Sequence, residues 1–231
     1  MIAIINNIRV LFGYTLIFTL LFGVNICMAC YNKIDATSSP PDKMNIVIDA
    51  GHGGIDSGCI GKTTKALESD INLSIAKKLG AMLSSLSINI IYTRSNSDGL
   101  YGTFASGHKM RDMRAREAII KKANPNLIIS IHLNSYTSAE PKGAQVFYAL
   151  NSEISKELAQ NLQELFAEKI PGSKHESKPG DFYILNCSSA PGILVECGFL
   201  SNPEEEAKLI QDSYQEKIAY IIACGIIGYL G

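Results

Sequence analysis

Residues 44–54 read MNIVIDAGHGG, a short apolar run that passes directly into a glycine-rich loop containing His52. This pattern is typical of a buried strand that enters a functional loop. Residues 69–86 carry apolar side chains at helical spacing, and a second strand is predicted at 88–93. Because a strand, a helix and a strand in this order form a β-α-β unit, the stretch predicts a parallel sheet with crossover helices.

The rest of the chain continues this alternation of apolar runs and amphipathic segments. Further strands are predicted at 127–133, 143–149, 182–185 and 193–197, and helices at 111–123, 152–168 and 213–229, with one more helix starting at the Asn202-Pro203-Glu204-Glu205 sequence. We therefore predict an α/β fold in a single domain, with a mostly parallel central sheet flanked by helices on both faces.

The N-terminal part of the chain differs in composition from everything that follows it. Residues 10–29 contain no charged side chain, and the chain becomes polar immediately afterwards. This length lies between that of a cleavable signal and that of a spanning helix, which needs about 20 apolar residues. We expect residues 1–30 to be a signal peptide or membrane anchor, residues 31–43 to be a linker and residues 44–231 to be the catalytic domain. The protein is thus expected to be exported and to act outside the cytoplasm, with membrane association if the segment is retained.

Composition limits the classes of partner. The 231 residues include 21 Lys and Arg against 22 Asp and Glu, so the chain has no basic field to attract nucleic acid. Four cysteines fall in the domain, at 59, 187, 197 and 224, and their spacing matches no metal motif. No nucleic-acid partner and no disulfide bond are predicted.

Two of the four histidines follow buried strands. His52 lies in DAGHGG after the first strand, and His132 lies in SIHLNS at the end of another. The carboxyl ends of parallel strands meet at one edge of a sheet, so both imidazoles are expected in one site. Glu68, at the start of the following helix, is the best third ligand for a catalytic zinc. Taken alone, Glu68 could simply favour the positive end of the helix dipole.

Glu196 ends the apolar strand ILVE, where an unpaired charge would be costly. A carboxylate next to a metal could accept a proton from water and return it to a leaving nitrogen. The alternative is that Glu196 is a buried structural residue paired with Arg114 or Arg116.

Four separated segments resemble the successive motifs of the zinc-dependent N-acetylmuramoyl-L-alanine amidases, the third amidase family. They are IDAGHGGIDSG, LESDINLSIAKKLGAML, RAREAIIKKANPNLIISIHLNS and GILVECGFLSNPEE, in the order and with the spacing of that family. The resemblance covers residues 44–230. It implies that His52, Glu68 and His132 bind Zn²⁺ and that Glu196 is the catalytic carboxylate. Ala50 stands where the family often has proline, which should not affect the chemistry.

Within that family, the short form with an N-terminal apolar segment is similar to the germination-specific branch of spore formers. The resemblance implies peptidoglycan of the spore cortex as substrate, cleavage on the route to muramic δ-lactam, and action in the cell wall or between the forespore membranes. It also implies a functional link to a muramic acid deacetylase and allows an activating protein partner. A vegetative wall amidase or autolysin, a zinc carboxypeptidase and a non-catalytic wall-binding protein are the alternatives.

Other polar residues receive structural interpretations. His108 and His175 are expected to be solvated loop histidines, and Asn134 is expected to hold a turn. Arg116 matches a family position, but a helical arginine is commonly solvated or ion-paired at the surface. We therefore leave Arg116 outside the catalytic set.

Overall fold

The structure is a computed structural model that describes residues 43–230 except 104 and 151. The predicted signal peptide or anchor at 1–30 and the linker up to residue 42 lie outside the described residues. Within the part of the chain that the structure describes, no helix has the length and apolarity required to cross a membrane. The compact domain begins at Lys43.

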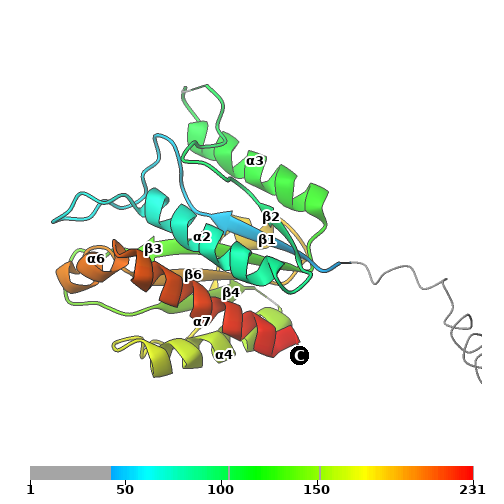
Figure 1. The fold of residues 1–231 in the computed structure, drawn as a ribbon. Coiled ribbons are helices and arrows are strands. Elements are labelled where there is room, and N and C mark those ends of the chain that lie inside the picture. Colours follow the sequence, from blue (N-terminus) through cyan, green and yellow to red (C-terminus); the bar gives the residue numbers. More distant parts are fainter. Residues whose placement is uncertain (1–42, 104, 151, 231) are drawn as a thin grey trace, which may run out of the picture. The chain divides into compact units, whose positions relative to one another are not determined.

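The centre of the domain is a six-stranded sheet with the strand order β2-β1-β3-β6-β4-β5 (Figure 1). The strands are β1 (Asn45–Ala50), β2 (Asn89–Tyr92), β3 (Leu127–Asn134), β4 (Gln145–Ala149), β5 (Lys178–Gly180) and β6 (Gly192–Phe199). The first four strands in that order pair in parallel, whereas β4 runs antiparallel to β6 and carries β5 parallel to itself. The prediction of a mostly parallel sheet is confirmed.

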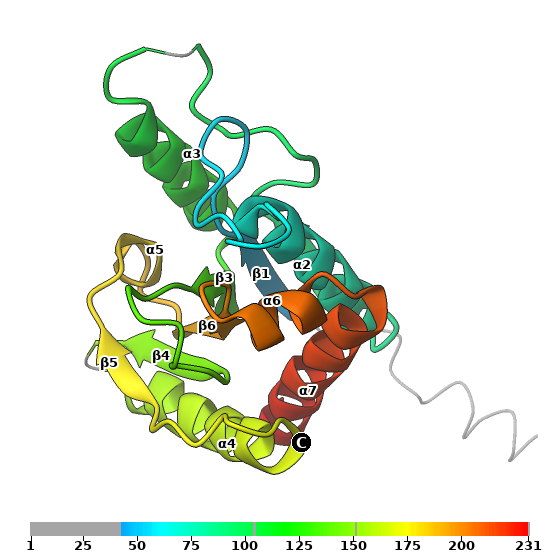
Figure 2. The same ribbon diagram turned by 90° about the vertical axis from the view of Figure 1, so that its left-hand side faces the viewer.

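Helices cover both faces of the sheet (Figures 1 and 2). One face packs against α2 (Glu68–Ser84), α4 (Glu153–Lys169) and α7 (Asp212–Leu230), and the other against α3 (His108–Ala123) and α5 (Tyr183–Asn186). Side chains of a strand alternate between faces, so Ile46 and Ile48 join the first cluster while Val47 joins the second. The predicted α/β fold is therefore confirmed.

The predicted start of a helix after residue 202 is also confirmed. Helix α6 (Pro203–Leu209) begins where the Asn202 side chain accepts hydrogen bonds from the backbone N–H groups of Glu204 and Glu205. Two N–H groups of the first turn, which have no partner inside the helix, are satisfied in this way. Proline in the first helical position loses nothing, because its missing N–H would have been unpaired.

The strand predicted at 182–185 is wrong. Phe182 is instead the N-cap of the short helix α5, and its carbonyl oxygen accepts a hydrogen bond from the N–H of Leu185. The helical turn buries the adjacent side chains of Ile184 and Leu185 in one cluster. A strand would send these neighbours to opposite faces, and the apolar run does not reveal which arrangement the surroundings require.

Candidate metal centre and adjoining pocket

The candidate residues gather because three neighbouring strands present polar side chains on one sheet face. His132 on β3 is in register with Glu196 on β6, and Asp49 on β1 is in register with Ser130 on β3. Partners in register on parallel strands point to the same face. The face in question is the one that α3 and α5 cover, and the polar residues lie toward the carboxyl ends of the strands.

Three side chains converge into a potential metal site. Ligand atoms of His52, Glu68 and His132 all lie within 4.8 Å of one another. Glu68 Oε1 lies 3.2 Å from His52 Nε2 and 3.1 Å from His132 Nδ1, and the two imidazole centroids are 5.1 Å apart. Two imidazoles and a carboxylate form a donor set that suits zinc. The structure thus brings the three predicted ligands together.

The glycine-rich loop is shaped by this convergence. A Cβ atom on Gly51 would lie 2.2 Å from Cε1 of His132, and one on Gly58 would lie 2.4 Å from Oε2 of Glu68. Neither position tolerates a side chain while the ligands stay in place. His52 itself adopts a left-handed conformation with φ of 63°, a region that costs a residue other than glycine about 1 kcal/mol or more.

Glu68 is held from both sides of its carboxylate. Oε2 accepts hydrogen bonds from the backbone N–H and the thiol of Cys59, each at 2.8 Å, and Oε1 accepts one from the N–H of Leu133 at 3.1 Å. Burial alone would raise the pKa of Glu68, but the hydrogen bonds and charges of His132 and His52 hold it far below its ordinary value. Glu68 therefore remains an anion, as a metal ligand must.

Asp56 lies behind His52. His52 Nδ1 donates to Asp56 Oδ2 at 3.0 Å, which leaves Nε2 facing Glu68. Burial lowers the pKa of His52, but hydrogen bonds and charges from Glu68 and Asp56 outweigh it and raise the pKa to about 9. The site therefore attracts positive charge. A carboxylate behind a ligating imidazole fixes its tautomer and orientation.

Glu196 differs from the other carboxylates of the site. Its Oε2 atom is buried and has no hydrogen-bond partner within the described residues. Burial raises the pKa of Glu196 to about 7; the charge of Glu68 adds to this shift, and those of His132 and His52 oppose it. A carboxyl group that exchanges its proton near neutral pH is suited to general acid-base work.

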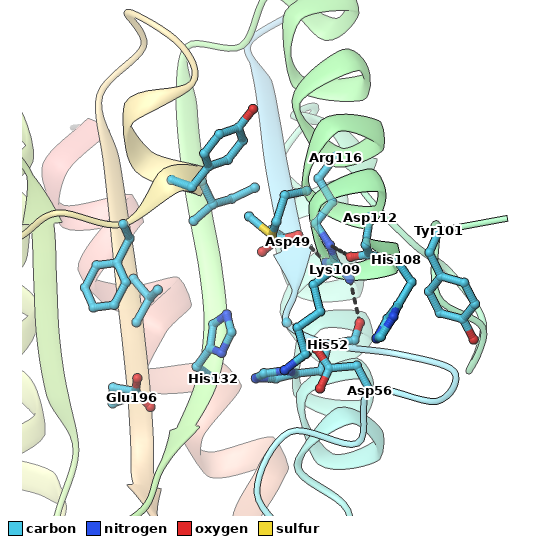
Figure 3. A pocket seen from close by; sticks show the side chains of 16 residues that line it. Asp49, His52, Asp56, Tyr101, His108, Lys109, Asp112, Arg116, His132 and Glu196 are labelled. Atoms are coloured by element: carbon cyan, nitrogen blue, oxygen red, sulfur yellow. Dashed lines mark hydrogen bonds and ion pairs between the residues drawn. The ribbon is translucent and has the colours of Figure 1, made fainter. Parts of the chain in front are cut away.

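The alternative pairing of Glu196 with an arginine is wrong. Arg116 instead donates to Asp49 Oδ1 at 2.6 Å and to Asp112 Oδ2 at 2.6 Å, and Arg114 is exposed. The prediction of a surface position for Arg116 is also wrong, because its side chain is only 2% exposed. Arg116 donates further to the carbonyl oxygen of His52 at 2.5 Å. It therefore supports the backbone of His52, on the side of α3 (Figure 3).

Two residues beneath the site were missed by the sequence analysis. Asp49 accepts hydrogen bonds from Thr93 and Ser130 as well as from Arg116. Arg94 donates to the carbonyl oxygens of Ala50, Gly51 and Ser69, which ties the loop after β1 to the start of α2. A signal was present in each case, because both charges adjoin apolar strands and buried charges need partners.

A cavity of about 290 Å³ adjoins the metal site. His52, His132 and Glu196 contribute to its lining, together with residues of the loop before α3, of α3 and of α5. Figure 3 shows His132 and Glu196 on adjacent strands and His108 and Lys109 at the start of α3. The cavity thus adjoins both the candidate metal ligands His52 and His132 and the carboxyl group of Glu196.

The remaining sequence interpretations have mixed outcomes. His108 is not a loop residue but the first residue of α3, where it lines the cavity. His175 is not simply solvated, since its Nε2 donates to the carbonyl oxygen of Lys142 at 2.8 Å. Asn134 is the last residue of β3 and holds no turn; its side chain accepts a hydrogen bond from the N–H of Ser135. Cys197 faces the apolar cluster on the far side of the sheet from Glu196.

Sequence comparison identifies similar proteins. The profile of the Amidase_3 family, described as N-acetylmuramoyl-L-alanine amidase, matches residues 46–228. The chain is 34% identical over 188 residues to the germination-specific N-acetylmuramoyl-L-alanine amidase of Bacillus subtilis, covering 80% of this chain and 78% of that protein. It is also 33% identical over 186 residues to the amidase LytC of B. subtilis, covering 80% of this chain and 35% of LytC.

Solved structures give the same relationship. The CwlD amidase from Clostridioides difficile, solved in complex with the GerS lipoprotein, superposes with a TM-score of 0.78 at 38% identity. That match covers 81% of this chain and 98% of CwlD. An N-acetylmuramoyl-L-alanine amidase from Clostridium difficile 630 superposes with a TM-score of 0.72 at 32% identity, covering 81% of this chain and 97% of the other.

Proposed function

The chain belongs to the N-acetylmuramoyl-L-alanine amidase family, and from this premise we propose that it is a zinc-dependent enzyme of the spore cortex. The activity of the family is hydrolysis of the amide between N-acetylmuramic acid and L-alanine in peptidoglycan. The single observation that carries the zinc proposal is the convergence of His52, Glu68 and His132 within 4.8 Å beside a cavity.

The donor set fits one zinc ion. Glu68 is anionic, and the imidazoles of His52 and His132 each turn a ring nitrogen toward it. Without a metal, protons on these imidazoles balance the charge of Glu68. A divalent cation bound there would take over this balance. Zinc held there would polarise the scissile carbonyl group and make a water molecule more acidic. Asp56 would fix the orientation of the ligand His52, and Cys59 that of the ligand Glu68.

Glu196 is assigned the proton transfers. In the ionised form its carboxylate would accept a proton from the attacking water, and it would then deliver this proton to the nitrogen of L-alanine as the amide bond breaks. The products are the free lactyl carboxylic acid on muramic acid and the free amino terminus of the peptide. The register of His132 with Glu196 supports this role, because it sets the carboxyl group next to the metal ligands.

The zinc proposal is tested by metal analysis and product analysis of the purified protein. We expect about one zinc per chain, and His132→Ala should lose most of it because one of three ligands is removed. Mass spectrometry of muropeptides should show free stem peptides with L-alanine at the amino terminus. Unchanged zinc content in His132→Ala would exclude the proposed ligand set, and cleavage within the peptide instead would favour a carboxypeptidase.

The cortex assignment is supported by similarity to the germination-specific enzyme of B. subtilis. Removal of the stem by this enzyme, followed by the action of a muramic acid deacetylase, would permit closure of the muramic δ-lactam. Since its substrate is peptidoglycan, the enzyme would act outside the cytoplasm, with residues 10–29 as the export signal or anchor. CwlD was solved with a lipoprotein, and we propose that an activating protein partner exists here too.

A gene deletion tests the cortex assignment separately from the chemistry. In a spore-forming host the deletion should leave vegetative growth intact and give a cortex without muramic δ-lactam. A normal δ-lactam content would refute the cortex role and favour a vegetative wall amidase. The amidase chemistry would stand in either case.

A further inference from the structure

The cavity beside the metal site contains one lysine, and the proposed chemistry gives it no task. Lys109 lines the cavity from the first turn of α3 and is exposed to solvent. Its ammonium group forms no ion pair within 4.0 Å among the residues that the structure describes. Arg116, the other strong cation of the cavity, is already engaged by Asp49 and Asp112. A positive charge at the cavity rim is therefore available to a ligand.

The position of Lys109 is fixed by the segment that precedes it. Arg111 donates to the carbonyl oxygens of Tyr101, Thr103 and Ser106, which fastens the loop before α3 to the helix. Asp112 accepts a hydrogen bond from the N–H of Leu100 at 2.5 Å and also binds Arg116. The loop that precedes Lys109 is thus fastened to the two residues of α3 that follow it closely.

Lys109 is directed toward the metal site. Figure 3 shows its side chain extending from α3 toward His52 and Asp56. Asp56 contacts the candidate metal ligand His52 directly. The ammonium group of Lys109 is therefore directed toward a residue that supports the metal site.

The substrate carries a negative charge close to its scissile bond. In peptidoglycan, L-alanine is followed by D-glutamate, which is joined onward through its γ-carboxyl group and so keeps a free α-carboxylate. Standard bond lengths place this carboxylate roughly 6 Å from the scissile nitrogen in an extended chain. We propose that Lys109 binds the free α-carboxylate of the residue that follows L-alanine in the peptide stem. This inference rests on the amidase function proposed above.

The prediction is a preference between two substrates that differ by one charge. The zinc-loaded full chain is assayed with N-acetylmuramoyl-L-alanyl-D-glutamate and with N-acetylmuramoyl-L-alanyl-D-isoglutamine, in which the α-carboxylate is an amide. Wild type should favour the first by about fivefold in kcat/KM at low salt, the scale of one partly exposed ion pair. In Lys109→Met the ratio should fall to about one, and added salt should weaken the preference of wild type.

Lys122→Met is the matched control, because Lys122 is exposed on the same helix and is not among the residues that line the cavity. It should keep the ratio of wild type. A ratio that Lys109→Met leaves unchanged, or a wild type without preference, would overturn the role of Lys109 while amidase activity stands. If wild type cleaves neither substrate, alone or in an extract of the sporulating host that supplies the activating partner, the proposed function fails together with this inference.

Discussion

Asp49 is buried and Glu196 is half-buried on the same sheet face, and the surroundings of the two carboxylates are opposite. Asp49 accepts hydrogen bonds from Thr93, Ser130 and Arg116, and it is only 2% exposed. Glu196 has a buried oxygen atom without a partner among the described residues. Burial would raise the pKa of both, but Arg116 and the hydroxyl groups lower that of Asp49 to about 2, whereas that of Glu196 rises to about 7.

The difference distinguishes Asp49, whose charge the fold stabilises, from Glu196, whose charge the fold disfavours. Asp49 stays ionised at every pH at which the protein works, so its negative charge can hold Arg116 and, through it, the backbone of His52. Glu196 costs stability in its ionised form because its burial outweighs the favourable charges of His132 and His52. Strongly shifted pKa values of this kind are common at functional sites. The contrast between Asp49 and Glu196 leads to three predictions.

The largest effect is expected from removing the partner of Asp49. Arg116→Met should leave the aspartate buried and unpaired, which lowers the free energy of unfolding by about 3–5 kcal/mol. Denaturant unfolding of the variant measures this loss. Arg114→Met is the control, since Arg114 is exposed on the same helix and should change stability little. Similar stabilities for the two variants would contradict a structural role for the Asp49–Arg116 pair.

The next effect is on catalysis at Glu196. Glu196→Gln should keep the fold and the zinc but lose at least ~10² in kcat, because the amide cannot carry the proton. Its stability should equal or exceed that of wild type, since the neutral side chain removes a charge that burial disfavours. Steady-state kinetics and metal analysis decide this. Near-normal turnover would exclude the catalytic role, and loss of zinc would make Glu196 a ligand.

The smallest effect is the acid sensitivity that Asp49 confers. The pKa of Asp49 falls from 3.8 to about 2 on folding, so its contribution to stability is fully present above about pH 4. It is lost as the pH falls toward 2, and the shift corresponds to about 2 kcal/mol. Unfolding of the zinc-free protein between pH 5 and 2 should show a shallower acid slope in Asp49→Asn than in wild type. Parallel slopes would mean that other carboxylates dominate.

Much of this molecule was predictable from local pattern. The strand at 44–50, the helix after Glu68 and the Asn202 cap follow from periodicity and capping chemistry, which act over a few residues. The strand predicted at 182–185 failed, because an apolar tetrapeptide is compatible with a strand or a helical turn and its packing against the second cluster decides between them. The role of Arg116 failed for a related reason. Helical spacing shows which side of a helix is apolar, but it does not show that Arg116 pairs with Asp49 on β1.

The sequence by itself determined the fold class and the set of chemical groups: two histidines and a glutamate after buried strands, and a glutamate inside an apolar one. Only the tertiary structure decided which of these groups are paired and which are left without a partner. Register put Glu196 beside His132 and left its oxygen unpaired, while crossover packing brought Arg116 under Asp49. The physical reason is that pairing and desolvation depend on distances between segments far apart in the chain, and these distances set each pKa.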